Sequence, residues 1–188
     1  MTKYILHGGA AKRETEDNKK FFVEITKNLS DTANLLVVCF AKEKNIWDEV
    51  FKNVKLTFSS ASPEKQIQFV LASKDTRAFI EQIKTANAIY ILGGETRVLR
   101  DYLAKVDDLE KLWSGKVIAG SSAGVLALAR YWYENDDDTY NKGLGIFPFK
   151  LFCHYTKEKS DKLDKLKEYG DDSEVRTIEE EKFLIIER

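Results

Sequence analysis

Short apolar runs alternate with amphipathic stretches along this chain, and that alternation limits the fold more than any other feature. The segment 73–94, SKDTRAFIEQIKTANAIYILGG, shows the pattern: Phe79, Ile80 and Ile83 share one helical face, and a continuous apolar run follows. A continuous run is typical of a strand covered on both faces. The sequence therefore predicts an α/β three-layer sandwich, with a mostly parallel central sheet flanked by helices.

The same patterns locate the individual elements. The predicted strands are Tyr4–Leu6, Leu35–Phe40, Val54–Phe58, Ile67–Leu71, Ile89–Leu92, Val117–Ala119 and Phe183–Ile186. The predicted helices are Asp17–Asn28, Ile46–Lys52, Asp75–Ala86, Thr96–Leu103 and Ser122–Arg130. The chain has no internal repeat or low-complexity linker, and its length suits one hydrophobic core. We therefore expect a single domain over residues 1–188.

Charge and cysteine content narrow the class of protein. The 30 basic and 31 acidic residues nearly cancel, so no strongly basic surface for nucleic acid is expected. The first apolar run is too short for a signal segment or a membrane span, which favours a cytoplasmic protein. Cys39 and Cys153 lack C-x-x-C spacing, which favours buried, reduced thiols over a disulfide or zinc site. The oligomeric state stays open, with a homodimer among the alternatives.

One glycine-rich turn carries a candidate nucleophile. Ligands of open α/β sheets bind beyond the carboxyl ends of the strands, where the segment Gly120–Gly124 lies. This segment reads G-S-S-A-G and matches G-x-S-x-G with Ser122 at its centre, between a predicted strand and a predicted helix. Glycines permit a sharp turn that exposes the serine, and the helix start supplies N–H groups for an oxyanion. The alternative is that Ser121 or Ser122 only caps the helix.

A serine hydroxyl needs a base to accept its proton, and the chain contains two histidines. His7 lies in LHGGA, after the first predicted strand, where a histidine beside glycines is also common in plain turns. His154 follows the apolar run 146–153, IFPFKLFC, which could end as a strand or loop at the same rim as Ser122. We therefore favour His154 as the base.

Three motifs together resemble the serine peptidases of the dipeptidase E and cyanophycinase group, whose fold is similar to class I glutamine amidotransferases. They are IYILGGET at 89–96, IAGSSAGVLAL at 118–128 and GLGIFPFKLFCHYT at 143–156. The resemblance is close over about the middle third of the chain. It implies that Ser122 is the nucleophile and His154 the base, with an oxyanion hole made by the N–H groups of Gly94 and Ala123.

The sequence also departs from the pattern of that family. Glu95 stands where the family usually has asparagine, and a carboxylate facing the substrate there would repel an acidic side chain. Cys153 stands where proline is common. The segment between nucleophile and histidine is short, so counting does not place the orienting acid. The stretch YWYENDDDTY offers Glu134, Asp136, Asp137 and Asp138, and from these we predict Asp137.

The residues predict acyl transfer through an acyl-enzyme on Ser122, with neither metal nor organic cofactor, and the resemblance implies that the substrate is a short peptide. Two alternatives remain. The chain could be an esterase on the same fold, or a binding module that keeps the amidotransferase-like fold without a competent triad.

Overall fold

The computed structural model describes residues 1–188 and contains two β-sheets. The central sheet has six strands in the order β10-β1-β5-β4-β2-β3. All of its neighbouring pairs are parallel except β10 against β1, so the predicted mostly parallel sheet is confirmed. Its strands are β1 (Lys3–His7), β2 (Asn34–Val38), β3 (Gln68–Leu71), β4 (Ala88–Ile91), β5 (Val117–Ser121) and β10 (Phe183–Glu187).

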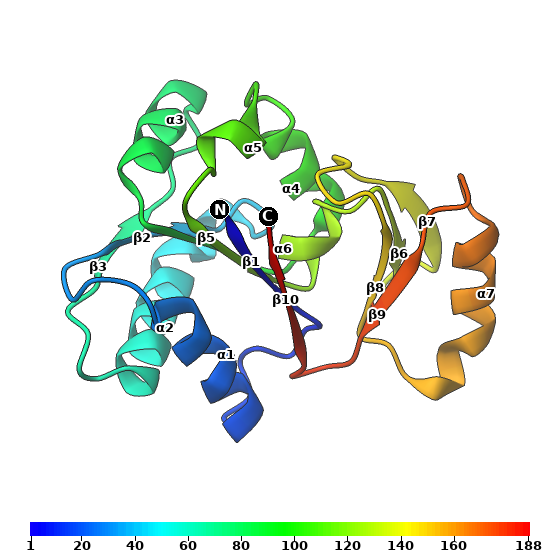
Figure 1. The fold of residues 1–188 in the computed structure, drawn as a ribbon, viewed down its shortest axis with the longest axis horizontal. Coiled ribbons are helices and arrows are strands. Elements are labelled where there is room, and N and C mark those ends of the chain that lie inside the picture. Colours follow the sequence, from blue (N-terminus) through cyan, green and yellow to red (C-terminus); the bar gives the residue numbers. More distant parts are fainter.

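Helices cover both faces of this sheet (Figure 1). On one face lie α1 (Glu16–Thr26) and α2 (Trp47–Ala61); on the other lie α3 (Thr76–Thr85), α4 (Thr96–Leu103) and the short α5 (Leu109–Leu112). On the first face, the Phe58 ring packs 5.0 Å from Phe22 of α1 and 5.5 Å from Tyr90 of β4, measured between ring centroids. The sheet is thus the middle layer of three.

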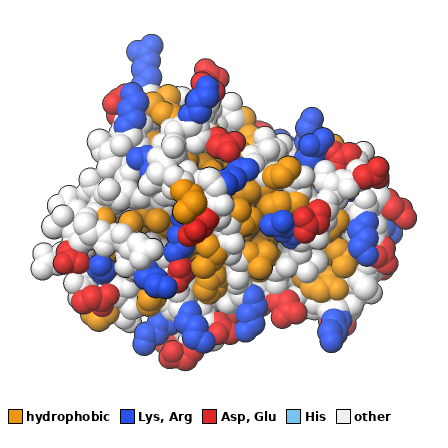
Figure 2. Space-filling model, in the orientation of Figure 1, with side chains coloured by type: hydrophobic (Ala, Val, Ile, Leu, Met, Phe, Trp, Pro, Cys, Tyr) orange, Lys and Arg blue, Asp and Glu red, His pale blue; other side chains and the backbone are white.

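The face shown in Figure 2 carries both charged and hydrophobic side chains. In the view of Figure 2, Lys and Arg side chains are interspersed with Asp and Glu, and hydrophobic side chains lie between them. No helix combines the length and the apolar character that crossing a membrane requires.

The prediction of a strand at Val54–Phe58 is wrong, because this segment belongs to α2. Its letters VKLTF alternate apolar and polar residues as a strand does. In the helix, however, Val54 and Phe58 are buried one turn apart, whereas Leu56 between them is 60% exposed. The buried positions of the whole helix, starting from Trp47 and Val50, follow a spacing of three and four residues.

The helix predicted over Ser122–Arg130 is much shorter in the structure. Only Ala123–Leu126 forms α6, and the chain turns into the strand Tyr131–Glu134. The backbone carbonyls of residues 127–130 accept hydrogen bonds from N–H groups of the loop 143–147. Because this loop supplies their partners, these residues need not continue the helix.

A second sheet, which the sequence patterns did not predict, adjoins the first. Its order is β7-β6-β8-β9. The strands are β6 (Tyr131–Glu134), β7 (Thr139–Lys142), β8 (Lys150–Cys153) and β9 (Val175–Ile178), and α7 (Ser160–Glu168) packs on them after the 3-10 turn Lys157–Lys159. Trp132 and Leu151 belong to the same hydrophobic core as the central sheet. Because β8 ends at Cys153, this sheet delivers His154 to the carboxyl ends of the central strands.

Candidate active site

Ser122 occupies a strained turn between β5 and α6. Its backbone has φ 52° and ψ −116°, a conformation that side chains rarely adopt and that functional sites often contain. Glycines lie close around it: a Cβ on Gly93 would lie 2.9 Å from the Ser121 carbonyl oxygen and 3.3 Å from the Ser122 Cβ, and one on Gly124 would lie 2.1 Å from the Ile91 carbonyl oxygen. The Ser122 side chain makes no capping hydrogen bond to α6. Ser122 is partly exposed whereas Ser121 is buried, so the two serines have different environments.

His154 lies directly beside this serine. Its Nε2 atom is 2.9 Å from the Ser122 Oγ. The histidine has φ 53°, and its N–H donates to the Gly8 carbonyl oxygen at 2.9 Å, which ties it to the loop after β1. The imidazole fills the space above Gly9, where an added Cβ would lie only 2.1 Å from the ring Cε1. Gly9 of LHGGA therefore makes room for the ring of His154, whereas Gly8 lies against the backbone of Glu179.

The other ring nitrogen of His154 contacts Glu180, in the turn between β9 and β10. Glu180 Oε1 lies 2.8 Å from Nδ1, and its Oε2 pairs with Arg13 Nη1 at 2.6 Å. The hydrogen bond from His154, reinforced by Arg13, holds the pKa of Glu180 below its usual value. A carboxylate at Nδ1 retains a proton on that nitrogen, which leaves Nε2 free to accept the proton of the Ser122 hydroxyl.

The structure does not place Asp137, the predicted orienting acid, in contact with the histidine. Asp137 pairs with Arg97 and accepts a hydrogen bond from Thr139, on the hairpin of β6 and β7. Of the other acids considered, Glu134 accepts from Thr96 and Trp132, and Asp138 accepts from the Tyr133 hydroxyl; neither bonds to His154. The acid that does was missed because it lies 26 residues beyond the histidine, in the run EEEK. The available signal was a group of acids just before the last predicted strand.

His7 is buried in a separate hydrogen-bond network. Its Nδ1 accepts from the Gly9 N–H at 3.2 Å and lies 3.0 Å from the Ser121 Oγ. Its Nε2 donates to Asn18 Oδ1 at 2.9 Å, because the Asn18 amide nitrogen already donates to two loop carbonyls. Burial lowers the pKa of His7 to about 4, although the Asn18 hydrogen bond opposes the shift. His7 is therefore a neutral residue that positions the loop after β1 and the neighbour of Ser122.

Two backbone N–H groups near Ser122 are available to a substrate oxygen. The Gly94 N–H makes no hydrogen bond within the chain. Gly94 also has φ +147°, and a Cβ there would lie 2.2 Å from the Ala41 carbonyl oxygen, so the position excludes a side chain. Ala123 is the first residue of α6, and its N–H has no acceptor one turn earlier in the helix.

The two residues that depart from the family pattern lie beside this site. Glu95 caps the N-terminus of α4, and its carboxylate accepts from the Arg97 N–H at 3.3 Å. The Glu95 side chain is 50% exposed and pairs with the Arg97 guanidinium, so its charge is partly offset. Cys153 is a fully buried free thiol, and burial raises its pKa well above the usual value. A neutral buried thiol has little reactivity.

Comparisons with known proteins identify the family and the fold of the chain. The model of peptidase family S51 matches residues 4–188. Comparison with curated protein sequences gave no match. Among solved structures, the crystal structure of a peptidase from an acI-B1 Actinobacterium is similar with a TM-score of 0.67 and 20% identity, covering 99% of this chain and 83% of that one.

A candidate peptidase E protein from Listeria monocytogenes EGD-e is similar with a TM-score of 0.69 and 18% identity, covering 99% of this chain and 94% of that one. At these identities the two structures show a shared fold, whereas the family match extends over nearly the whole chain. This chain belongs to peptidase family S51 and is a serine peptidase.

Proposed function

We propose that this serine peptidase hydrolyses short peptides through an acyl-enzyme on Ser122. The observation that carries the proposal is the hydrogen-bonded series from the Ser122 hydroxyl through His154 to the Glu180 carboxylate, with distances of 2.9 and 2.8 Å. A nucleophile, a base and an orienting acid within hydrogen-bond reach are what nucleophilic acyl transfer needs.

The reaction proceeds in two stages. Ser122 Oγ attacks the peptide carbonyl carbon while His154 Nε2 accepts its proton, and the N–H groups of Gly94 and Ala123 stabilise the oxyanion. His154 then protonates the leaving amine as the C–N bond breaks. In the second stage a water molecule gives a proton to His154 and attacks the ester, which releases the acid and restores the serine. Glu180 stabilises the imidazolium in both stages without accepting its proton.

Glu95 contributes to the choice of substrate in this proposal. It follows Gly94 directly, and its half-exposed carboxylate disfavours an acidic side chain at that end of the site. Arg97 offsets part of this charge, so the effect is a selectivity rather than an absolute exclusion. The alternative of a non-catalytic module rested on Glu95 and on the unplaced acid. The contact of Glu180 with His154 supplies an acid and so favours the catalytic proposal, whereas Glu95 stays beside the site in either case.

A dipeptide-library hydrolysis assay on wild type and Ser122→Ala tests the proposal. Ser122→Ala should lose hydrolysis and labelling by a fluorophosphonate probe while unfolding in urea like the wild type. His154→Ala should lose at least about 10³-fold in turnover, and His7→Ala, the matched histidine control, far less. Including p-nitrophenyl esters separates an esterase from a peptidase. Wild-type turnover in Ser122→Ala, or the reverse ranking of the histidines, contradicts the assignment.

A further inference from the structure

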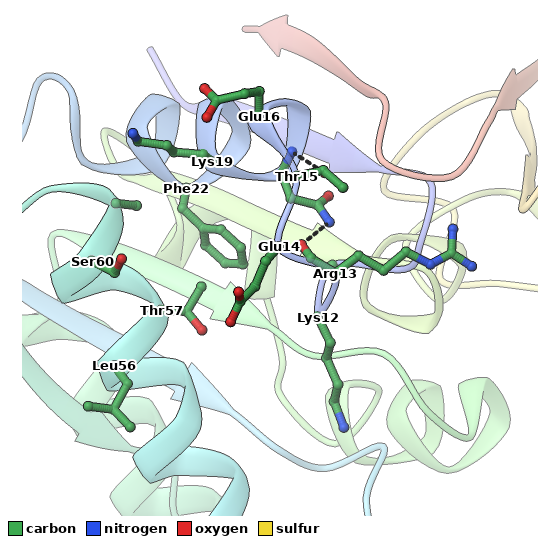
Figure 3. Close-up of a pocket in the computed structure, with 13 residues that line it drawn as sticks. Lys12, Arg13, Glu14, Thr15, Glu16, Lys19, Phe22, Leu56, Thr57 and Ser60 are labelled. Carbon is green, nitrogen blue, oxygen red and sulfur yellow. Dashed lines mark hydrogen bonds between the residues drawn. The ribbon is translucent and has the colours of Figure 1, made fainter.

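A cavity with two adjoining parts opens between the loop after β1, α1 and α2. The outer part has a volume of about 440 Å³ and a polar, charged lining (Figure 3). The inner part has a volume of about 360 Å³, and seven of its eleven lining residues are hydrophobic. Both volumes fall in the range of ligand sites, and the inner lining has the apolar character that such sites usually have. The two parts share Ala11, Lys12, Glu14, Phe22, Leu56 and Thr57.

The inner part adjoins the catalytic residues on two sides. Leu92 lines it and directly precedes Gly93, whose added Cβ would lie 3.3 Å from the Ser122 Cβ. Because consecutive Cα atoms are about 3.8 Å apart, this wall is within one residue of the nucleophile's turn. On the other side, Ala11 lies two residues beyond Gly9, which contacts the His154 ring. A peptide bound at Ser122 can therefore extend a neighbouring side chain into this space.

Tyr90 supplies a polar group at the wall of the inner part. Its side chain is only 4% exposed and lines the inner part. Trp113 Nε1 is the one buried side-chain nitrogen or oxygen without a partner, so the Tyr90 hydroxyl is not a sealed, unsatisfied group. A hydroxyl at the wall of an open cavity can donate to or accept from a group that enters the cavity. In Figure 3, Phe22, Glu14 and Thr57 point toward a common space, whereas Arg13 points away from it.

We propose that the inner part of this cavity is a specificity pocket for a large, mainly apolar side chain of the substrate, on a residue next to the scissile bond. The identity of the ligand as a peptide rests on the proposed function. Leu92, Val50 and Val54 supply apolar contact, and the Tyr90 hydroxyl supplies one hydrogen-bonding group at the wall. An apolar pocket also agrees with Glu95, which disfavours acidic side chains nearby.

The test fills the pocket from its exposed side. Thr57 and Ser59 are both exposed residues of α2, but only Thr57 lines the cavity, so Thr57→Trp is the test and Ser59→Trp the matched control. Asn53→Phe, one turn earlier on the lining face, repeats the test if Thr57→Trp does not fold. The hydrolysis readout is the ratio of kcat/KM for dipeptides with leucine against glycine at each position. Binding of N-acetyl-leucinamide and of N-acetylglycinamide is measured by NMR titration. The proteins titrated carry Ser122→Ala, alone and together with Thr57→Trp or Ser59→Trp.

Wild type should prefer leucine over glycine by at least about tenfold at one position, the scale of discrimination by a hydrophobic pocket. Thr57→Trp should abolish this preference, and Ser59→Trp should retain it. Peptide hydrolysis without a preference that depends on Thr57 overturns the pocket but leaves the proposed function standing. If no peptide is cleaved, the proposed function fails, but the binding measurement still tests the pocket. Tighter binding of N-acetyl-leucinamide than of N-acetylglycinamide, lost in Thr57→Trp, supports the pocket. Equal binding of the two amides overturns the pocket.

Discussion

Gly9 gives the sharpest test of the active-site geometry, because its missing side chain is what leaves room for His154. In Gly9→Ala the new methyl group would lie 2.1 Å from the ring Cε1 and 2.4 Å from Nε2. Carbon atoms in contact keep about 3.5 Å apart, so the ring or the loop must move by roughly 3.5 − 2.1, or about 1.4 Å. Alanine at φ +120° is also strained, which makes it harder for the loop to give way.

A displacement of this size disturbs the contact with the nucleophile. The Ser122 Oγ to His154 Nε2 distance is 2.9 Å, and moving the ring by about 1.4 Å changes the length or the alignment of this hydrogen bond enough to weaken it. A misplacement of about 1 Å costs on the order of 10² in rate. We therefore expect kcat/KM to fall at least about 100-fold, which corresponds to about 2.7 kcal/mol of transition-state stabilisation.

The matched control is Gly145→Ala. Gly145 also has a positive φ, +70°, but an added Cβ there would meet no atom within 4 Å. Both variants therefore carry backbone strain, and only Gly9→Ala contacts the catalytic ring. The assay compares kcat/KM, the rate of fluorophosphonate labelling and the urea midpoint of both proteins. Gly9→Ala with activity equal to that of Gly145→Ala, at equal stability, would refute the argument.

Two further predictions follow from the charges around the site. Glu180→Gln should lower kcat by about 10³-fold or more, because an amide no longer fixes the tautomer of His154. The control Asp137→Asn should change kcat by less than about threefold. Steady-state kinetics in which Asp137→Asn loses more activity than Glu180→Gln contradict the Glu180 assignment. Burial lowers the pKa of His7 from 6.5 to about 4, so the unfolded chain binds a proton that the folded chain excludes, and stability falls as the pH falls through this window. Between pH 6.5 and 5 the loss should be about 1.2 × 1.36, or roughly 1.6 kcal/mol, because half of the unfolded chains already carry the proton at pH 6.5. Urea unfolding of His7→Gln should lack this loss.

Most of the central sheet could be predicted because its strands are continuous apolar runs. Ile89–Leu92 and Leu35–Phe40 are covered on both faces, so nearly every residue in them is apolar and the signal is strong. The strand predicted at Val54–Phe58 failed because five alternating letters also fit a helix whose middle residue, Leu56, faces solvent. The second sheet was missed because its strands are only four residues long, too short to show a period. Thr139–Lys142 is also only partly buried, whereas Lys150–Cys153 is buried but has a lysine at its start.

The candidate site divides in the same way. The sequence alone determined the turn at Ser122, because strand, glycines and helix start are neighbours in the chain and their steric demands are local. The pairing with His154 followed from the order of motifs and from the apolar run before it. Only the tertiary structure decided that Glu180 rather than Asp137 contacts the histidine, and that Gly9 leaves the space for its ring. These contacts join segments that sheet pairing brings together, and the number of residues between two segments does not determine how far apart they lie in the folded protein.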